Sequence, residues 1–193
     1  MARHIDHGRA LLAGLPERGR VLDLGSGGGL PGLVLAICRP DVDLTLLEAR
    51  QRACRFLREA VADLGVAGVA VIEARAEDAA RRPDLRETFD AVVARSFGPP
   101  AVTAECAVGF LRPGAALVVS EPPGDEAWEL HQPPPRQTRA ARWPAAGLAE
   151  LGFGPPVAGG GEEASFVVLE KTRSDDRWPR RVGVPAKRPL WTA

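Results

Sequence analysis

The 193-residue sequence contains no tyrosine, one methionine and three cysteines. Without tyrosine the chain lacks the tyrosine–lysine pair by which many small Rossmann oxidoreductases transfer hydride, which disfavours that class. The cysteines, Cys38, Cys54 and Cys106, are odd in number and widely spaced, with no C-x-x-C pair to indicate zinc binding or dithiol exchange. We therefore expect free, buried thiols in a reducing compartment.

The sequence also lacks net charge and long apolar runs. Its 25 basic residues balance 25 acidic ones, so no overall positive field gathers nucleic acid, and an RNA partner would need local patches. No uncharged apolar segment reaches membrane-spanning length, and no secretory leader is recognisable, which predicts a cytoplasmic protein without a membrane partner. His4 and His7 are too weak a pair to indicate a metal, so we predict no metal site.

Length and composition are those of one globular domain. Hydrophobic residues make up 45% of the chain and charged residues 26%, which excludes a largely disordered protein. A chain of this length buries a core without disulfides or metals. We predict a monomer with a single domain over residues 1–193, including a short helix at 1–18 and an extended basic tail at 174–193.

Short apolar runs alternate with helical patterns from Arg20 onward, which predicts an α/β fold with a parallel sheet covered by helices. We expect buried strands, apolar on both faces, at 20–24, 43–48, 69–73, 89–94 and 115–120, and a further strand at 165–170.

The intervals between strands predict helices and loops. Residues 49–65 form an amphipathic pattern that ends at Gly65 and predicts a surface helix, with its apolar face formed by Ala53, Phe56, Leu57, Ala60, Val61 and Leu64. Two proline clusters predict a long loop at 122–143. A helix is expected near 144–151, and GGGEE at 159–163 is interpreted as a turn.

The segment VLDLGSGGGLPG, residues 21–32, carries the strongest functional signal. A buried strand runs directly into a glycine-dense turn and then a helix, an arrangement that lets the backbone approach a ligand closely. Open α/β sheets bind ligands at the carboxyl ends of such strands. We predict a cofactor crevice formed by Asp23, Gly25, Ser26, Gly27 and Gly29.

Two cofactor classes fit this loop. Residues 27–32 satisfy the dinucleotide fingerprint G-x-G-x-x-G, and Glu48 lies where a ribose-binding acid should. However, Asp23 at the strand end would repel a pyrophosphate, whereas it suits the cationic methionyl end of S-adenosylmethionine. We favour S-adenosylmethionine and keep a dehydrogenase, or glycines that serve helix–strand packing alone, as alternatives.

Five segments carry a family resemblance: DLGSGGGLPG (23–32), LLEARQRACRFLREA (46–60), Arg-Ala-Glu (75–77), FDAVVARSF (89–97) and RWPRRVGVPAKRPL (177–190). They resemble the bacterial small-subunit ribosomal RNA guanine-N7 methyltransferases, also called the glucose-inhibited division protein B family. The Leu-Pro-Gly after the glycines is seldom found in other methyltransferases. The resemblance extends over most of the chain outside 122–160.

The resemblance implies a class I methyltransferase, with a Rossmann-like, mostly parallel seven-stranded sheet, helices on both faces and an antiparallel last strand. It also implies cofactor contacts at the positions that match the family motifs: Gly25 and Leu30 in the loop, Glu48 with Ala49 at the ribose, Ala76 and Glu77 at the adenine, and Arg95 after the fourth strand.

The implied substrate is a guanine of ribosomal RNA or of the small ribosomal subunit. Its N7 attacks the sulfonium methyl without losing a proton, so we name no catalytic base. Phe97 is the candidate for stacking on the target base, and Arg180, Arg181, Lys187 and Arg188, interleaved with Trp178 and Trp191, are candidates for holding phosphates.

Two alternatives remain at the sequence level. One is a methyltransferase acting on a small metabolite, favoured by Glu121, which replaces the family's usual Lys-Gly, and by the few residues before the first strand. The other is a methyltransferase-like domain that binds RNA or protein without transferring a methyl group. Loss of cofactor binding would favour this second alternative.

Overall fold

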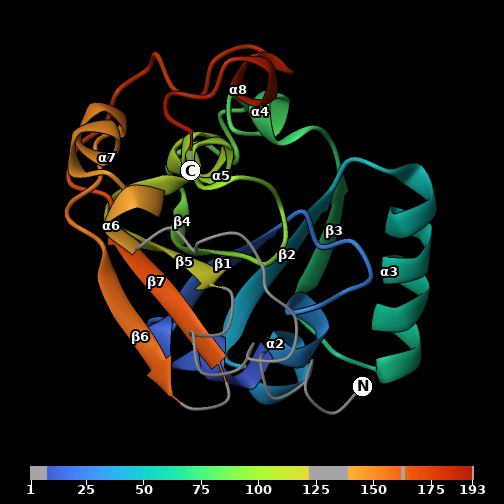
Figure 1. The fold of residues 1–193 in the computed structure, drawn as a ribbon. Helices are drawn as coiled ribbons and strands as arrows, with labels where there is room; N and C mark the ends of the chain where they lie inside the picture. The colour runs from blue at the N-terminus through green and yellow to red at the C-terminus, as the bar shows by residue number, and fades with distance from the viewer. Residues whose placement is uncertain (1–7, 122–138, 162–163, 193) are drawn as a thin grey trace, which may run out of the picture.

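The computed structural model describes residues 8–121, 139–161 and 164–192 (Figure 1). Its centre is a seven-stranded sheet with the order β3-β2-β1-β4-β5-β7-β6. The strands are β1 (Gly19–Leu24), β2 (Val42–Glu48), β3 (Val69–Glu73), β4 (Phe89–Ala94), β5 (Leu111–Glu121), β6 (Val157–Gly161) and β7 (Ala164–Glu170).

Strands β1 to β5 are parallel, whereas β7 runs antiparallel to both β5 and β6. The predicted α/β class and the mostly parallel seven-stranded sheet are therefore confirmed. From β1 the chain proceeds through β2 and β3 towards one edge of the sheet, then returns to β4 and proceeds to the other edge. The topological switch point lies between β1 and β4, which is where open α/β sheets bind their ligands.

Helices cover both faces of the sheet, as the family resemblance implied (Figure 1). One face packs against α4 (Ala76–Ala79), α5 (Pro100–Val108) and α7 (Ala145–Leu151), and the other against η1 (Leu11–Gly14), α2 (Gly32–Cys38) and α3 (Gln51–Leu64). Alternation along β1 separates the two cores, because Leu22 belongs to the first and Val21 to the second.

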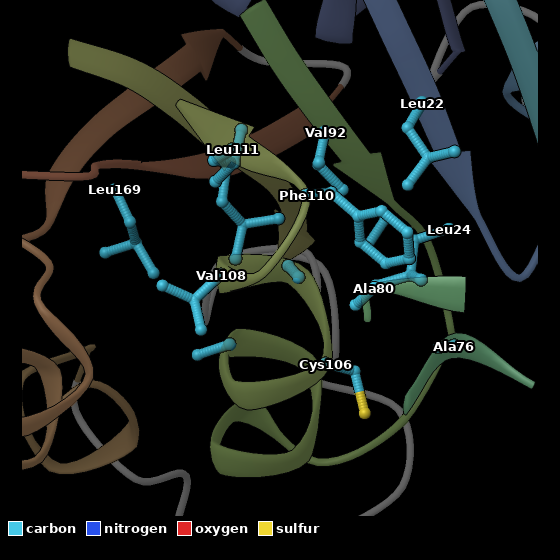
Figure 2. Packing of buried hydrophobic residues seen from close by; sticks show 14 of the residues in the cluster. Leu22, Leu24, Ala76, Ala80, Val92, Cys106, Val108, Phe110, Leu111 and Leu169 are labelled. Carbon is cyan, nitrogen blue, oxygen red and sulfur yellow. The ribbon is translucent and has the colours of Figure 1, made fainter. Parts of the chain in front are cut away.

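Helix α5 is buried on every side, which its nearly uniform apolar sequence explains. Figure 2 shows Cys106 and Val108 of this helix in one cluster with Leu22 and Val92 of the sheet. Cys54 and Cys106 are buried free thiols, as predicted, while Cys38 is partly exposed.

Several predicted elements differ from the structure. The apolar face of α3 is centred on Cys54 and Leu57, and Phe56 and Leu64 are about half exposed, at 50% and 47%. Gly65 ends this helix in a left-handed conformation, as expected from its position. Strand β3 is not buried on both faces, because it lies at the sheet edge.

The predicted turn at 159–163 is wrong in its first part, because Gly159 to Gly161 belong to β6, which pairs with β7. The predicted loop at 122–143 is also wrong at its end, since Arg139–Arg142 form α6 and Trp143 is buried. Residues 122–138 and 162–163 lie outside the described part. The helix expected near 144–151 is present as α7.

Both terminal segments of the chain contain short helices. Residues 1–7 and 193 lie outside the described part, while residues 8–10 are helical and lead into η1. The C-terminal segment is not extended throughout, because Val184–Lys187 form α8, and Trp178 is buried in the core. Among the helices of the described ranges, none is long and apolar enough to cross a membrane.

Candidate functional site

The turn after β1 is built around Asp23, whose side chain is 1% exposed. Its Oδ2 accepts a hydrogen bond from the Gly32 N–H at 3.1 Å, so the carboxylate is tied to the first residue of α2. Ser26 Oγ donates to the Asp23 carbonyl at 3.0 Å. The N–H groups of Gly25 and Ser26 both donate to the Leu47 carbonyl, at 2.8 and 3.0 Å, and thus fix the turn to β2.

Burial raises the pKa of Asp23 to about 7. Hydrogen bonds from Ser26 and Gly32 oppose this rise, and the nearby negative charge of Glu48 adds to it. An acid held in this way is poorly stabilised as an anion by the protein alone. A cationic ligand would supply the missing stabilisation.

Glycines are required where the turn approaches its neighbours most closely. At Gly25 the φ angle is +74°, and a Cβ would lie 2.5 Å from Cδ2 of Phe97. At Gly32 a Cβ would lie 2.5 Å from the Asp23 Oδ2. Around Gly28, in contrast, a Cβ would meet no atom within 4 Å. The loop is therefore tight at its base and open at Gly28.

Glu48 ends β2 and reaches back to the glycine loop. Its Oε2 accepts the Gly27 N–H at 2.9 Å, and its Oε1 accepts the Arg50 N–H at 2.9 Å and the Arg50 Nε at 3.2 Å. Burial alone would raise the pKa of Glu48, but these hydrogen bonds together hold it below its ordinary value. Glu48 is thus a charged acceptor at the edge of the loop, and Ala49 beside it is exposed.

The turn after β3 joins the same edge, because the Ala74 N–H donates to the Glu48 carbonyl at 3.1 Å. Ala76 and Glu77 follow, at 6% and 3% exposure. Glu77 Oε1 accepts the Gly183 N–H at 2.9 Å and a weaker hydrogen bond from Arg75 at 3.5 Å.

The turn after β4 carries Arg95 and Phe97, both partly exposed. Ser96 between them has a φ of +54°, a left-handed conformation that non-glycine residues adopt infrequently and that is often found at functional sites. This backbone turn directs the Phe97 ring onto Gly25, across the switch point between β1 and β4.

The structure therefore brings all the predicted cofactor residues to the carboxyl ends of β1 to β4: Asp23, Gly25, Ser26, Gly27, Gly29, Leu30, Glu48, Ala49, Ala76, Glu77 and Arg95. The donor set fits S-adenosylmethionine, because a buried acid offers a partner for positive charge and Glu48 offers acceptors for hydroxyl groups. Within the described ranges, no group of three His, Cys, Asp or Glu side chains is arranged to hold a metal ion.

The predicted phosphate-binding residues fall into two groups. Arg180 is engaged by the buried Glu105 through three hydrogen bonds, whereas Arg181, Lys187 and Arg188 have exposed side chains. Trp178 and Trp191 pack back on the domain.

The structure changes the interpretation of Glu121. This residue is 7% exposed, and its carboxylate accepts hydrogen bonds from Trp143 Nε1 at 2.9 Å and Arg142 Nε at 3.0 Å. Its charge is therefore offset inside the fold and is not presented to a phosphate path. Glu121 therefore does not support the alternative of a small-metabolite substrate, which the sequence favoured partly through this residue.

Sequence reasoning missed three contributors to the site: Gly32, Arg50 and Gly183. Gly32 was part of the quoted motif, and its contact with Asp23 follows from the turn that the glycines permit. Arg50 lies two residues after Glu48 and was a candidate by proximity. Gly183 lies in the segment 177–190 that carries the family resemblance, but nothing in that segment indicates a contact with Glu77, because the contact is made by a backbone N–H brought from 106 residues away.

Comparisons with known proteins identify the family and the fold of this chain. The family model described as rRNA small subunit methyltransferase G, or GidB, matches residues 1–126. A protein named ribosomal RNA small subunit methyltransferase G from Moorella thermoacetica is 36% identical over 177 residues, covering 91% of this chain and 71% of the relative. One of the same name from Rubrobacter xylanophilus is 39% identical over 183 residues, covering 91% and 67%.

Solved structures share the fold at lower identity. A SAM-dependent methyltransferase from Aquifex aeolicus superposes with a TM-score of 0.61 at 18% identity, covering 87% of this chain and 90% of that one. The apo form of the S-adenosylmethionine-dependent methyltransferase SibL gives a TM-score of 0.63 at 22% identity, covering 86% and 55%. The chain belongs to the rRNA small subunit methyltransferase G family and is a class I methyltransferase whose cofactor is S-adenosylmethionine.

Proposed function

We propose that this protein transfers a methyl group from S-adenosylmethionine to N7 of a guanine in small-subunit ribosomal RNA. The observation that carries the proposal is the glycine loop at the switch point between β1 and β4, where Gly25 lies against the Phe97 ring and the buried Asp23 is hydrogen-bonded to Gly32. Family membership supplies the substrate class.

We assign each part of the cofactor to residues at the carboxyl ends of β1 to β4. Asp23 is assigned to the positive charge of the methionyl end, and Glu48 with Ala49 to the ribose hydroxyls. Ala76 and Glu77 are assigned to the adenine, and Gly25, Leu30 and Arg95 line the path between them. When bound, the cofactor supplies a methyl group on a positively charged sulfur.

Guanine N7 needs little chemical help from the protein. Its lone pair would form the new C–N bond as the methyl–sulfur bond of the bound cofactor breaks, and no proton would have to be removed from the nitrogen. The work of the protein is then to align nucleophile, methyl and sulfur, which accounts for a large share of a rate enhancement. This agrees with a site built mainly of backbone groups and two acids.

Phe97 is the residue proposed to hold the target base. Its ring borders the glycine loop, and aromatic rings bind unpaired bases by stacking. Arg95 lies two residues earlier in the same turn. A guanine in a loop of the RNA would enter between this turn and the cofactor.

Exposed basic side chains at the same edge are proposed to hold phosphates. The side chains of Arg50 and Arg75 are 73% and 55% exposed beside Glu48 and Glu77. Arg181, Lys187 and Arg188 lie around α8, which is next to α4 in Figure 1. A local patch of this kind supplies affinity for RNA in a chain without net charge. We further propose that the protein acts as a monomer in the cytoplasm.

The test is methyl transfer from labelled cofactor to ribosomal RNA and to 30S subunits, both prepared from cells that lack this protein. We expect the label at a single guanine, located by cleavage chemistry specific for 7-methylguanosine. Cofactor binding without transfer to either substrate would contradict the ribosomal proposal and favour a small metabolite. Absence of cofactor binding would favour a domain that binds without catalysis.

A further inference from the structure

The C-terminal segment 175–191 is attached to the domain by several contacts, one of which is with Glu77 at the carboxyl edge of the sheet. We propose that this segment contributes to cofactor binding, with Gly183 as a positioning residue for Glu77. The inference rests on the proposed adenine role of Glu77. It concerns residues beyond the range 1–126 that the family model matches.

The segment begins with an anchor in the core. Trp178 is 5% exposed and belongs to the cluster around α5. The Arg86 guanidinium donates to the Trp178 carbonyl at 3.0 Å, and the Arg81 guanidinium donates to the Pro179 carbonyl. Pro179 packs so closely on Gly109 that a Cβ there would lie 2.9 Å from its Cδ. The chain is thereby fixed where it passes α5.

The next contact is an ion pair inside the domain. Glu105 of α5 is fully buried, and Arg180 donates to it from its backbone N–H at 2.9 Å, from Nε at 2.8 Å and from the terminal guanidinium nitrogen at 2.5 Å. A buried carboxylate is costly unless it is paired and hydrogen-bonded. Arg180 therefore neutralises a buried charge of α5, and Glu105 of α5 in turn holds the segment on the domain.

Three residues after this ion pair, the segment reaches the cofactor edge. The Gly183 N–H donates to Glu77 Oε1 at 2.9 Å. Among the described residues, Arg75 also contacts this carboxylate, at 3.5 Å, through a side chain that is more than half exposed. The hydrogen bond from the Gly183 backbone N–H is the shorter of the two. It therefore sets the orientation of the Glu77 side chain on the four-residue helix α4.

A second tether reaches the carboxyl end of β5. Trp191 Nε1 donates to the Arg142 carbonyl at 3.0 Å, and Arg142 in turn donates to Glu121 at the end of β5. The Trp191 ring also packs against Gly147 of α7. The segment thus links the turn after β3 to the end of β5, with the switch point between them.

A pair of matched glycine variants tests the proposal. Gly183 has a φ of +76° and Gly114 a φ of +84°, and a Cβ at either position would meet no atom within 4 Å. Both N–H groups donate hydrogen bonds, Gly183 to Glu77 and Gly114 to the carbonyl of Lys171, the residue directly after β7. Valine at either site therefore strains a left-handed backbone without a close contact at Cβ, but only Gly183 lies at the cofactor edge.

Cofactor affinity is measured by calorimetry well below the melting temperature of each variant. We expect Gly183→Val to weaken S-adenosylmethionine binding by about tenfold and Gly114→Val to change it by less than about twofold, while both lower the melting temperature. Equal effects on affinity, or no effect of Gly183→Val, would overturn the proposal.

The ion pair provides an independent second test. Arg180→Gln leaves the buried Glu105 carboxylate without its guanidinium partner. The segment should then detach from α5, and cofactor binding should weaken. The double variant Glu105→Gln with Arg180→Gln removes both charges and should recover most of the lost affinity. Failure of the double variant to recover affinity while it recovers the melting temperature would contradict the positioning role.

These readouts separate the inference from the ribosomal proposal. They use the full chain and the cofactor alone, without RNA. A wild type that binds the cofactor but does not methylate ribosomal RNA would contradict the proposed substrate and leave the role of Gly183 to be decided by the glycine pair.

Discussion

Replacing Asp23 by asparagine should stabilise the protein at alkaline pH while it removes cofactor binding. Asparagine keeps the size of the side chain and an oxygen that accepts the Gly32 N–H. It lacks the negative charge that burial makes costly and that we assign to the cationic end of the cofactor. Stability and function are therefore expected to change in opposite directions, a trade-off common at ligand sites.

The magnitude follows from the pKa of Asp23, which burial raises from 3.8 to about 7. Below pH 3.8 the carboxyl is protonated in both the folded and the unfolded chain and adds no pH dependence. Between pH 3.8 and 7 the unfolded chain loses this proton first, so the free energy of unfolding falls as the pH rises. Above pH 7 the full cost is present and amounts to ~4 kcal/mol, at about 1.4 kcal/mol per tenfold change in the ionisation constant.

Urea denaturation of the wild type and Asp23→Asn between pH 5 and 8 measures this difference directly. We expect the variant to be more stable by about 2–4 kcal/mol at pH 8 and the advantage to shrink towards pH 5. Calorimetry should show the wild type binding S-adenosylmethionine more tightly as the pH rises to 7, since a cation favours the ionised carboxyl. A variant that is less stable than the wild type at pH 8 would refute the reasoning.

Three further substitutions test separate parts of the structure. Gly32→Ala places a Cβ against Leu46 and 2.5 Å from the Asp23 carboxylate, so we expect a loss of about 1–3 kcal/mol in urea denaturation together with weaker cofactor binding; unchanged affinity would contradict the described turn. Lys171→Met removes a buried ammonium that donates to Glu87 at 2.6 Å and to two backbone carbonyls. The variant should lower the free energy of unfolding by about 3–5 kcal/mol. Cofactor affinity, measured below the melting temperature, should not change. Phe97→Leu keeps an apolar side chain but loses the flat ring, and we expect kcat on ribosomal RNA to fall about tenfold at unchanged cofactor affinity, whereas wild-type kcat would show that the ring does not stack on the base.

Strands β1 to β5 and β7 and the glycine loop after β1 were predictable because their signals are local. Buried parallel strands are continuous apolar runs, and the run VLDL followed by glycines identifies both β1 and its turn. Strand β6 was missed because Gly159 to Gly161 have no strand pattern of their own and pair through the backbone with β7. The exposure of Phe56 on α3 was also missed, since periodicity defines an apolar stripe but not the residues that the sheet covers.

The sequence by itself determined the class of fold, the glycine loop that we propose holds the cofactor, and the acids Asp23 and Glu48 beside it, because each depends on residues adjacent along the chain or on the period of one element. Tertiary structure alone decided that Arg180 neutralises Glu105, that Glu121 is paired inside the fold and that Gly183 contacts Glu77. These contacts join residues 21 to 106 positions apart. Their identity depends on where packing places each segment, and no local pattern encodes that placement.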